Sequence, residues 1–210
     1  MPSLVASLLT AYLLGSFPTS ILAGRLLRGI DIRQHGSGNA GAANALRVLG
    51  WWPGITVLAI DLAKGWVAVR LAVRLCGDTG PLDPAWVGAL AGGSAMAGHL
   101  WPAFARFRGG KGVATAAGAM LAIEPRFIAV AVPVFLLTVV ATRRISAASM
   151  LAACSVPIVF AALQLWGRVD VTPAALGFAA LSAVVILVAH RPNIRNLLAG
   201  REPPVGGTRR

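Results

Sequence analysis

Long apolar runs alternate with short polar stretches along almost the whole chain. An apolar run of about 20 residues is long enough to cross the hydrocarbon core of a bilayer as one α-helix. The pattern therefore predicts an all-α integral membrane protein with seven transmembrane helices, in a single polytopic domain over residues 1–210. The expected spans are Ser3–Gly24, Trp51–Leu75, Ala85–Trp101, the short Gly112–Ile123, Phe127–Thr142, Ser146–Trp166 and Ala174–Ala189. A kink is expected in the first span at Gly15–Pro18.

Composition narrows the class of protein. Hydrophobic residues make up 57% of the chain and charged residues 12%, and the mean hydropathy is +0.74. Because a soluble domain carries roughly 25% charged residues, this chain is too apolar to be one. The two cysteines, Cys76 and Cys154, are interpreted as small apolar residues, since they suggest neither a disulfide framework nor a metal site.

Positive charge is concentrated in the stretches expected on one side of the membrane. Of the 19 Lys and Arg residues, 14 lie in Arg25–Arg47, His99–Lys111, Arg143–Arg144 and the tail from His190. In a membrane protein this asymmetry indicates cytoplasmic loops rather than a nucleic-acid binder. We therefore expect the N-terminus outside and the C-terminus in the cytoplasm.

The first of three polar stretches, Gly36–Arg47, reads GSGNAGAANALR. It matches G-x-G-x-x-G, but the dinucleotide fingerprint requires a preceding buried strand, and here a charged loop precedes it. Ser37, Asn39, Asn44 and Arg47 instead offer hydroxyl, amide and guanidinium donors on a pliable backbone. A ligand site is favoured over a loop that is merely rich in turn residues.

The second polar stretch, Gly98–Thr115, reads GHLWPAFARFRGGKGVAT and lies between two apolar runs. Consecutive glycines let backbone N–H groups approach an anion, and Lys111 adds a point charge. From these residues alone, phosphate binding and a cytoplasmic loop that only sets topology are equally favoured.

The third stretch, HRPNIRNLLAGRE, begins at His190 and ends at Glu202. A histidine is the usual proton-transfer group near neutral pH, although His190 by itself could simply end the last span. Its place beside Asn193, and the expected convergence of all three stretches on one membrane face, favour a function. Arg47 and Lys111 could then hold a dianionic phosphate, and Ser37 with the glycine turn could bind a second phosphate or an oxyanion.

Two ionisable residues fall inside the second expected span, about 15 Å from its cytoplasmic end at 1.5 Å per residue. Asp61 and Lys64 are three residues apart, so they can pair on one helix face. Because ionisable groups at such depth are costly and usually paired, we expect a structural ion pair that supports the site rather than catalysis.

The three polar stretches together resemble the three motifs of the bacterial acyl-phosphate:glycerol-3-phosphate acyltransferase family (PlsY). The segments DLAKG at Asp61–Gly65 and GSFP at Gly15–Pro18 fit the family as well. The resemblance covers nearly the whole chain in order, with compatible spacing. It implies a seven-helix fold in the bacterial cytoplasmic (inner) membrane, a cytoplasm-facing site, no cofactor or metal, and function as a monomer.

The family resemblance also implies the reaction and the residues. A fatty acyl group would pass from acyl-phosphate to the sn-1 hydroxyl of glycerol-3-phosphate, giving lysophosphatidic acid and phosphate, the first step of phospholipid synthesis. Motif position implies catalytic roles for Ser37, His190 and Asn193; substrate binding by Arg47, Lys111, Asn39, Asn44, Gly109, Gly110, Gly112, His99 and Ser146; and structural support from Asp61, Lys64 and Glu202. The family usually has Thr where this chain has Ala43, so a hydrogen bond to phosphate could be missing. Either His190 or a substrate phosphate oxygen could be the base.

Two other classes of protein stay open on the residues alone. A small organic-phosphate transporter would also use a deep ion pair, kinking glycines and anion-binding loops. A membrane scaffold would use the basic loops to bind anionic lipid. Against the transporter, the chain has no repeated half with matching broken segments, and the donors gather on one face.

Overall fold

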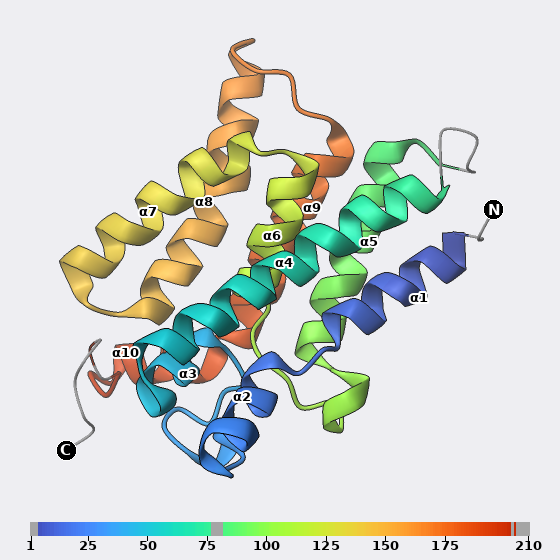
Figure 1. The fold of residues 1–210 in the computed structure, drawn as a ribbon. Helices are drawn as coiled ribbons and strands as arrows, with labels where there is room; N and C mark the ends of the chain where they lie inside the picture. Colours follow the sequence, from blue (N-terminus) through green and yellow to red (C-terminus); the bar gives the residue numbers. More distant parts are fainter. Residues whose placement is uncertain (1–3, 77–81, 203, 205–210) are drawn as a thin grey trace. The chain divides into compact units, whose positions relative to one another are not determined.

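The computed structural model describes residues 4–76, 82–202 and 204, and all regular structure within them is helical (Figure 1). The position Ser3 and the end of the basic tail lie outside these residues. The α-helices are α1 Leu4–Gly15, α2 Thr19–Arg28, α3 Ala42–Leu49, α4 Trp51–Cys76, α5 Pro84–Leu100, α6 Val113–Ile123, α7 Arg126–Thr142, α8 Ile145–Leu165, α9 Pro173–Ala189 and α10 Arg191–Leu198. Two short 3-10 helices are η1 Ile32–Gln34 and η2 Ala103–Ala105.

The chain forms two compact units, Met1–Ile123 and Glu124–Arg210. The first unit contains α1 to α6 and carries the first two polar stretches. The second contains α7 to α10 and carries the third. A single polytopic domain stays a prediction.

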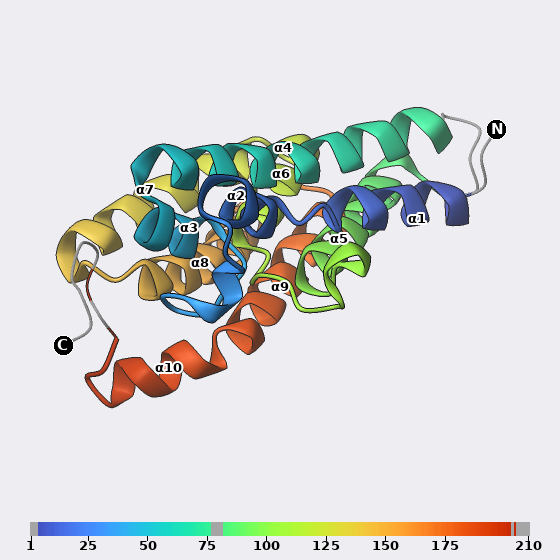
Figure 2. The same ribbon diagram turned by 60° about the horizontal axis from the view of Figure 1, so that its bottom comes forward.

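Close helix packing in the first unit depends on residues without bulky side chains. Figures 1 and 2 show α1, α4 and α5 running side by side, and α6 also packs on α4. A Cβ added at Gly15 would overlap the backbone of Ala95, and one at Gly65 would overlap the carbonyl of Thr115. Small residues at such crossings let helix backbones approach closely, which is how helices associate in membranes. The Gly- and Ala-rich composition of these spans is therefore a packing requirement.

The break expected in the first span is confirmed. Helix α1 ends at Gly15 and α2 begins at Thr19, with Pro18 directly before the first residue of α2. Proline has no N–H to donate and cannot continue a helix without strain. At this break the carbonyl of Phe17 accepts hydrogen bonds from the backbone N–H of Thr19 at 3.0 Å and from Lys64 Nζ at 3.2 Å.

The polar stretch before α4 does not cross a membrane as one helix but folds into η1 and α3. Helix α3 buries Asn44, Ala45 and Leu49 and leaves Arg47 exposed, so it is amphipathic. Gly54 of α4 lies against the backbone of Leu46, where a Cβ would be within 3 Å of three atoms. This contact fixes α3 beside the start of α4.

In the second unit, α7 packs on α8 and α8 packs on α9. The rings of Phe127 and Phe160 meet edge to face with centroids 4.7 Å apart. Arg126 pairs with Glu124 at 2.6 Å and donates to the carbonyl of Asp170 at 2.9 Å, which joins the start of α7 to the loop before α9. Helix α10, which the sequence pattern did not predict, is bent by 60° from α9.

By length and composition, two described helical stretches could cross a membrane, namely Leu4–Arg28 and Ile145–Leu165. The bent pair of α9 and α10 could form a third. Helices α6 and α7 are apolar but shorter, and the 26-residue α4 carries four charged residues. The expected boundaries agree with the observed helices to within one or two residues from α4 to α9, whereas seven spans and their orientation stay predictions.

Candidate active site

Four polar side chains meet inside the first unit, although helical membrane proteins bury few such groups. Asp61 is 2% exposed, and its Oδ1 lies 2.8 Å from Lys64 Nζ. The same oxygen accepts a hydrogen bond from Thr19 Oγ1 at 3.0 Å and lies 3.7 Å from Nδ1 of His99. The expected pairing of Asp61 with Lys64 is therefore confirmed, and its supporting role stays a prediction. Thr19 was not predicted as part of this cluster. The only sign of its role in the sequence is a hydroxyl residue directly after Pro18.

The buried cluster has too little space for a substrate. The cavity beside it measures about 10 Å³ and is bordered by Thr19, Asp61, Lys64, His99, Gly109 and Gly110, among others. That volume holds about one water-sized group. We conclude that this cluster fixes helices and loops, and that His99 is packed within it.

The glycine turn, residues 109–112, is held against the end of α5 by backbone hydrogen bonds. The N–H of Gly109 donates to Leu100 O at 3.0 Å, and that of Gly110 donates to His99 O at 3.1 Å. Both N–H groups are thus bonded within the protein, and anion binding by Gly109 and Gly110 stays a prediction. Gly112 has φ +78°, a left-handed conformation that favours glycine, and it ends the turn directly before α6.

Gly110→Ala is expected to destabilise the protein by about 1–3 kcal/mol, the usual cost of overpacking. The added Cβ would overlap His99 Nε2 and lie 2.5 Å from the carbonyl of Ala40. Gly93→Ala is the matched control, because nothing lies within 4 Å of a Cβ added there. Thermal melting of both purified variants tests this expectation, and equal melting temperatures would contradict it.

Asn44 organises the first polar stretch from inside. Its side chain is 1% exposed, and its Nδ2 donates to the carbonyls of Ile32 at 3.0 Å and His35 at 3.1 Å. Its Oδ1 accepts the backbone N–H of Ser37 at 2.8 Å. Both hydrogens of the amide and its oxygen thus hold the loop, and substrate binding by Asn44 stays a prediction.

The other predicted residues of this stretch lie nearer the surface. Ser37 and Arg47 are exposed, and Asn39 is half-buried. Ser37 follows Gly36, which has φ +62° and lies so close to Asn44 Oδ1 that a Cβ would overlap it. The loop thus places the Ser37 hydroxyl at the surface on a backbone fixed by Asn44.

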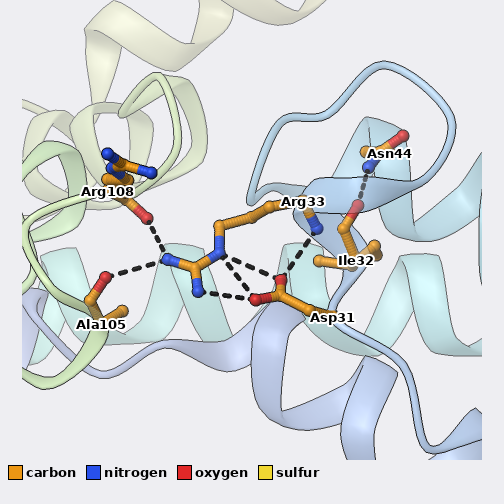
Figure 3. Close-up of polar contacts among 6 residues, drawn as sticks. All are labelled: Asp31, Ile32, Arg33, Asn44, Ala105 and Arg108. Atoms are coloured by element: carbon orange, nitrogen blue, oxygen red, sulfur yellow. Dashed lines mark hydrogen bonds and ion pairs between the residues drawn. The ribbon is translucent and has the colours of Figure 1, made fainter.

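The structure brings the first two polar stretches together, as expected. The Ala40 carbonyl lies against Gly110, and Arg33 Nη1 donates to the carbonyls of Ala105 at 2.9 Å and Arg108 at 3.2 Å (Figure 3). Lys111, which lies within the glycine turn, is half-buried. Neither Asp31 nor Arg33 was singled out in the sequence; the Asp-x-Arg spacing just before the first motif is the signal that could have found them.

A larger hollow lies where α2 and the loop after it face the loop between α5 and α6. It measures about 390 Å³ and is lined by Pro18, Ile21, Leu22, Arg25, Asp31, Arg33, Phe104, Ala105 and Arg106. Its volume is in the range of small-molecule pockets. The arginines make it electropositive, which suits a phosphate-bearing ligand.

In the second unit, His190 ends α9 and is 3% exposed. Its Nδ1 lies 2.8 Å from the carbonyl oxygen of Ile186. Because a carbonyl only accepts, Nδ1 must carry the hydrogen, and in the neutral ring Nε2 is then the basic nitrogen. The backbone therefore selects the tautomer that a proton acceptor at Nε2 requires.

Two further predicted residues of this unit contact each other. Asn193 Nδ2 donates to both carboxylate oxygens of Glu202, at 2.9 and 3.0 Å, which agrees with a bracing role for Glu202. Ser146 is buried near the start of α8, and its hydroxyl has no hydrogen-bond partner among the described residues.

Comparison with known proteins identifies the family. The fold matches that of PlsY (YgiH), described as an integral membrane glycerol 3-phosphate acyltransferase. Its glycerol 3-phosphate form has a TM-score of 0.83 and 35% sequence identity, covering 96% of this chain and 94% of that one. The lysophosphatidic acid form has a TM-score of 0.81. The family model for glycerol-3-phosphate acyltransferase matches residues 5–200. This chain belongs to the glycerol-3-phosphate acyltransferase family.

Curated members of the family are similar over nearly their whole length. The glycerol-3-phosphate acyltransferase of Pelodictyon phaeoclathratiforme is 42% identical over 98% of this chain and 97% of its own. That of Salinibacter ruber is 41% identical over 98% and 93%. The chain is accordingly an integral membrane acyltransferase acting on glycerol-3-phosphate. Among the described residues, no group of three His, Cys, Asp or Glu side chains is placed to hold a metal ion.

Proposed function

We propose that this glycerol-3-phosphate acyltransferase takes its acyl group from acyl-phosphate. The sn-1 hydroxyl of glycerol-3-phosphate is the acceptor, and the products are lysophosphatidic acid and inorganic phosphate, which begins phospholipid synthesis. The enzyme works as a monomer in the bacterial inner membrane, with its active site facing the cytoplasm.

The structural match to PlsY carries the proposal. The two matching structures are a glycerol 3-phosphate form and a lysophosphatidic acid form, and both cover 96% of this chain. The first names the acceptor and the second names the acylated product. The three sequence motifs that resemble the acyl-phosphate-dependent family support the choice of donor.

The reaction requires little from the protein beyond positioning the two substrates and stabilising the charge that develops during acyl transfer. The hydroxyl oxygen forms a bond to the acyl carbonyl carbon, and the carbonyl becomes an oxyanion. The bond from that carbon to the phosphate oxygen then breaks, and phosphate leaves with its electron pair. The hydroxyl proton passes to His190 Nε2 or to a phosphate oxygen, and both acceptors stay candidates.

The remaining roles follow from residue chemistry. Arg47 offers a planar fork to a phosphate, and Lys111 offers a point charge. The exposed Ser37 hydroxyl is a donor for a substrate phosphate or the oxyanion. Ala43 is exposed on α3 and supplies no hydroxyl, so it cannot donate the hydrogen bond to phosphate that a threonine at this position could make.

The donor is tested by phosphate release from purified protein in lipid, supplied with palmitoyl-phosphate and glycerol-3-phosphate. We expect release that requires both substrates and is matched by formation of lysophosphatidic acid. Palmitoyl-CoA and palmitoyl-acyl-carrier protein serve as parallel donors and should give no product. Turnover with either thioester but not with acyl-phosphate would overturn the donor assignment, and saturable glycerol-3-phosphate binding without any turnover would favour a transporter.

A further inference from the structure

Asp31 and Arg33 form an ion pair in the loop between α2 and α3 (Figure 3). Arg33 Nη2 lies 2.7 Å from Asp31 Oδ2, and Nε donates to Oδ1 at 3.0 Å and to Oδ2 at 3.2 Å. The backbone N–H of Arg33 donates to the same carboxylate at 3.0 Å. This fork-to-carboxylate geometry fixes the plane of the guanidinium.

The third nitrogen of that guanidinium reaches a different part of the chain. Arg33 Nη1 donates to Ala105 O at 2.9 Å and to Arg108 O at 3.2 Å, 72 and 75 residues further along. Both carbonyls belong to the loop between α5 and α6, which leads directly into the glycine turn and Lys111. One side chain therefore connects the loops of the first two motifs.

The segment between those two carbonyls has an unusual backbone. Arg106 and Phe107 have φ of 56° and 57°, in the left-handed region that residues with a Cβ disfavour. Within the loop, Phe107 N donates to Pro102 O at 3.0 Å, and Arg108 N donates to Ala105 O at a long 3.3 Å. Strained residues persist only where their surroundings hold them. Arg33 bonds the carbonyls directly before and directly after this pair.

Arg33 contributes little net charge to the adjacent hollow. Its hydrogen bonds lower the pKa of Asp31 from 3.8 to about 2. A lowered carboxyl pKa means that the pair stabilises the fold above pH 3.8 and loses this effect as the pH falls through 2, so the pair is ionised near neutral pH. Arg25 and Arg106 also line the hollow, and neither has an ion pair within the described residues. An anion in the hollow would therefore contact Arg25 and Arg106, whereas Arg33 acts by holding the loop in position.

We propose that Arg33 is a positioning residue for acyl transfer, because it holds the left-handed turn at Arg106–Phe107 and thereby the start of the glycine turn that carries Lys111. The inference rests on the proposed role of Lys111 in binding substrate phosphate. Asp31 is the anchor that orients the guanidinium.

Arg33→Lys and Arg33→Gln distinguish geometry from charge. Lysine keeps the charge but cannot bond the carboxylate and both carbonyls with a fixed fork. We expect both variants to lower kcat by on the order of 10–100-fold, since misplacing a substrate-positioning group has such an effect. We also expect faster hydrogen–deuterium exchange confined to a peptide covering residues 103–112. Arg28→Gln, an exposed arginine at the end of α2, is the control and should change neither.

Several outcomes would overturn the proposal. These are wild-type kcat in Arg33→Lys alongside a loss in Arg33→Gln, a raised KM with kcat retained, unchanged exchange in residues 103–112, and a uniform rise of exchange in every helix. Asp31→Asn keeps Arg33 and weakens its anchor, so it should reproduce the local exchange even if the Arg33 variants fold poorly. If the wild-type enzyme does not use acyl-phosphate, the exchange experiment still tests the tether, and the two failures are distinguishable.

Discussion

Asp61→Ala is expected to lower the free energy of unfolding by about 3–5 kcal/mol, because removing one partner of a buried ion pair leaves the other charge uncompensated. Lys64 is 8% exposed, so solvent cannot replace the lost carboxylate. Thr19 would lose its acceptor in the same step. For a protein of this size the change corresponds to a fall in melting temperature of roughly 6–20 °C.

Thermal unfolding can be followed with a thiol-reactive dye in a Cys154→Ala background, since Cys154 is only half-buried, whereas Cys76 is 3% exposed and becomes reactive when the helices separate. The double variant Asp61→Ala/Lys64→Met is the control. It buries no unpaired charge and should recover most of the lost stability. A single variant that melts within about 2 °C of the wild type would show that the pair contributes little.

Lys111→Ala is expected to lower kcat/KM for acyl transfer by at least about 100-fold, since deleting one group that stabilises developing charge commonly costs 10²–10³. The two glycines before Lys111 are fixed to α5 by two backbone hydrogen bonds, so the backbone that carries the Lys111 side chain is rigid. Arg47→Ala is expected to cause a similar loss, because it removes the guanidinium proposed to bind the same class of group.

The measurement is phosphate release together with lysophosphatidic acid formation, by each purified variant at equal protein concentration. Arg47→Lys should recover only part of the activity, since lysine keeps the charge but loses the fork. Arg28→Ala lies outside the three motifs and should behave as wild type. Full activity in either Lys111→Ala or Arg47→Ala would remove the phosphate-clamp assignment from that residue.

Many residues of the candidate site could be proposed from the sequence, because they lie in short motifs that can be recognised without the fold. Three glycine-, asparagine- and histidine-bearing stretches indicated the family, and the i,i+3 spacing of Asp61 and Lys64 indicated their pairing. Hydrogen-bond partners were harder to predict. Asn44 looked like a ligand donor, yet the carbonyls of Ile32 and His35 occupy its amide. Arg33 looked like an ordinary loop charge, yet its partners are 72 and 75 residues away.

By itself, the sequence determined the helical class, the helix boundaries from α4 to α9, the break before Thr19 and the family. These depend on apolar run length, proline chemistry and side-chain type, which are properties of neighbouring residues. Only the tertiary structure decided which hydrogen-bond donors are already bonded to other parts of the protein. A hydrogen bond between distant loops depends on chain topology, and no local pattern records it. In the glycine turn, the composition predicted a close backbone approach, and the tertiary structure shows that the end of α5 is the partner of Gly109 and Gly110.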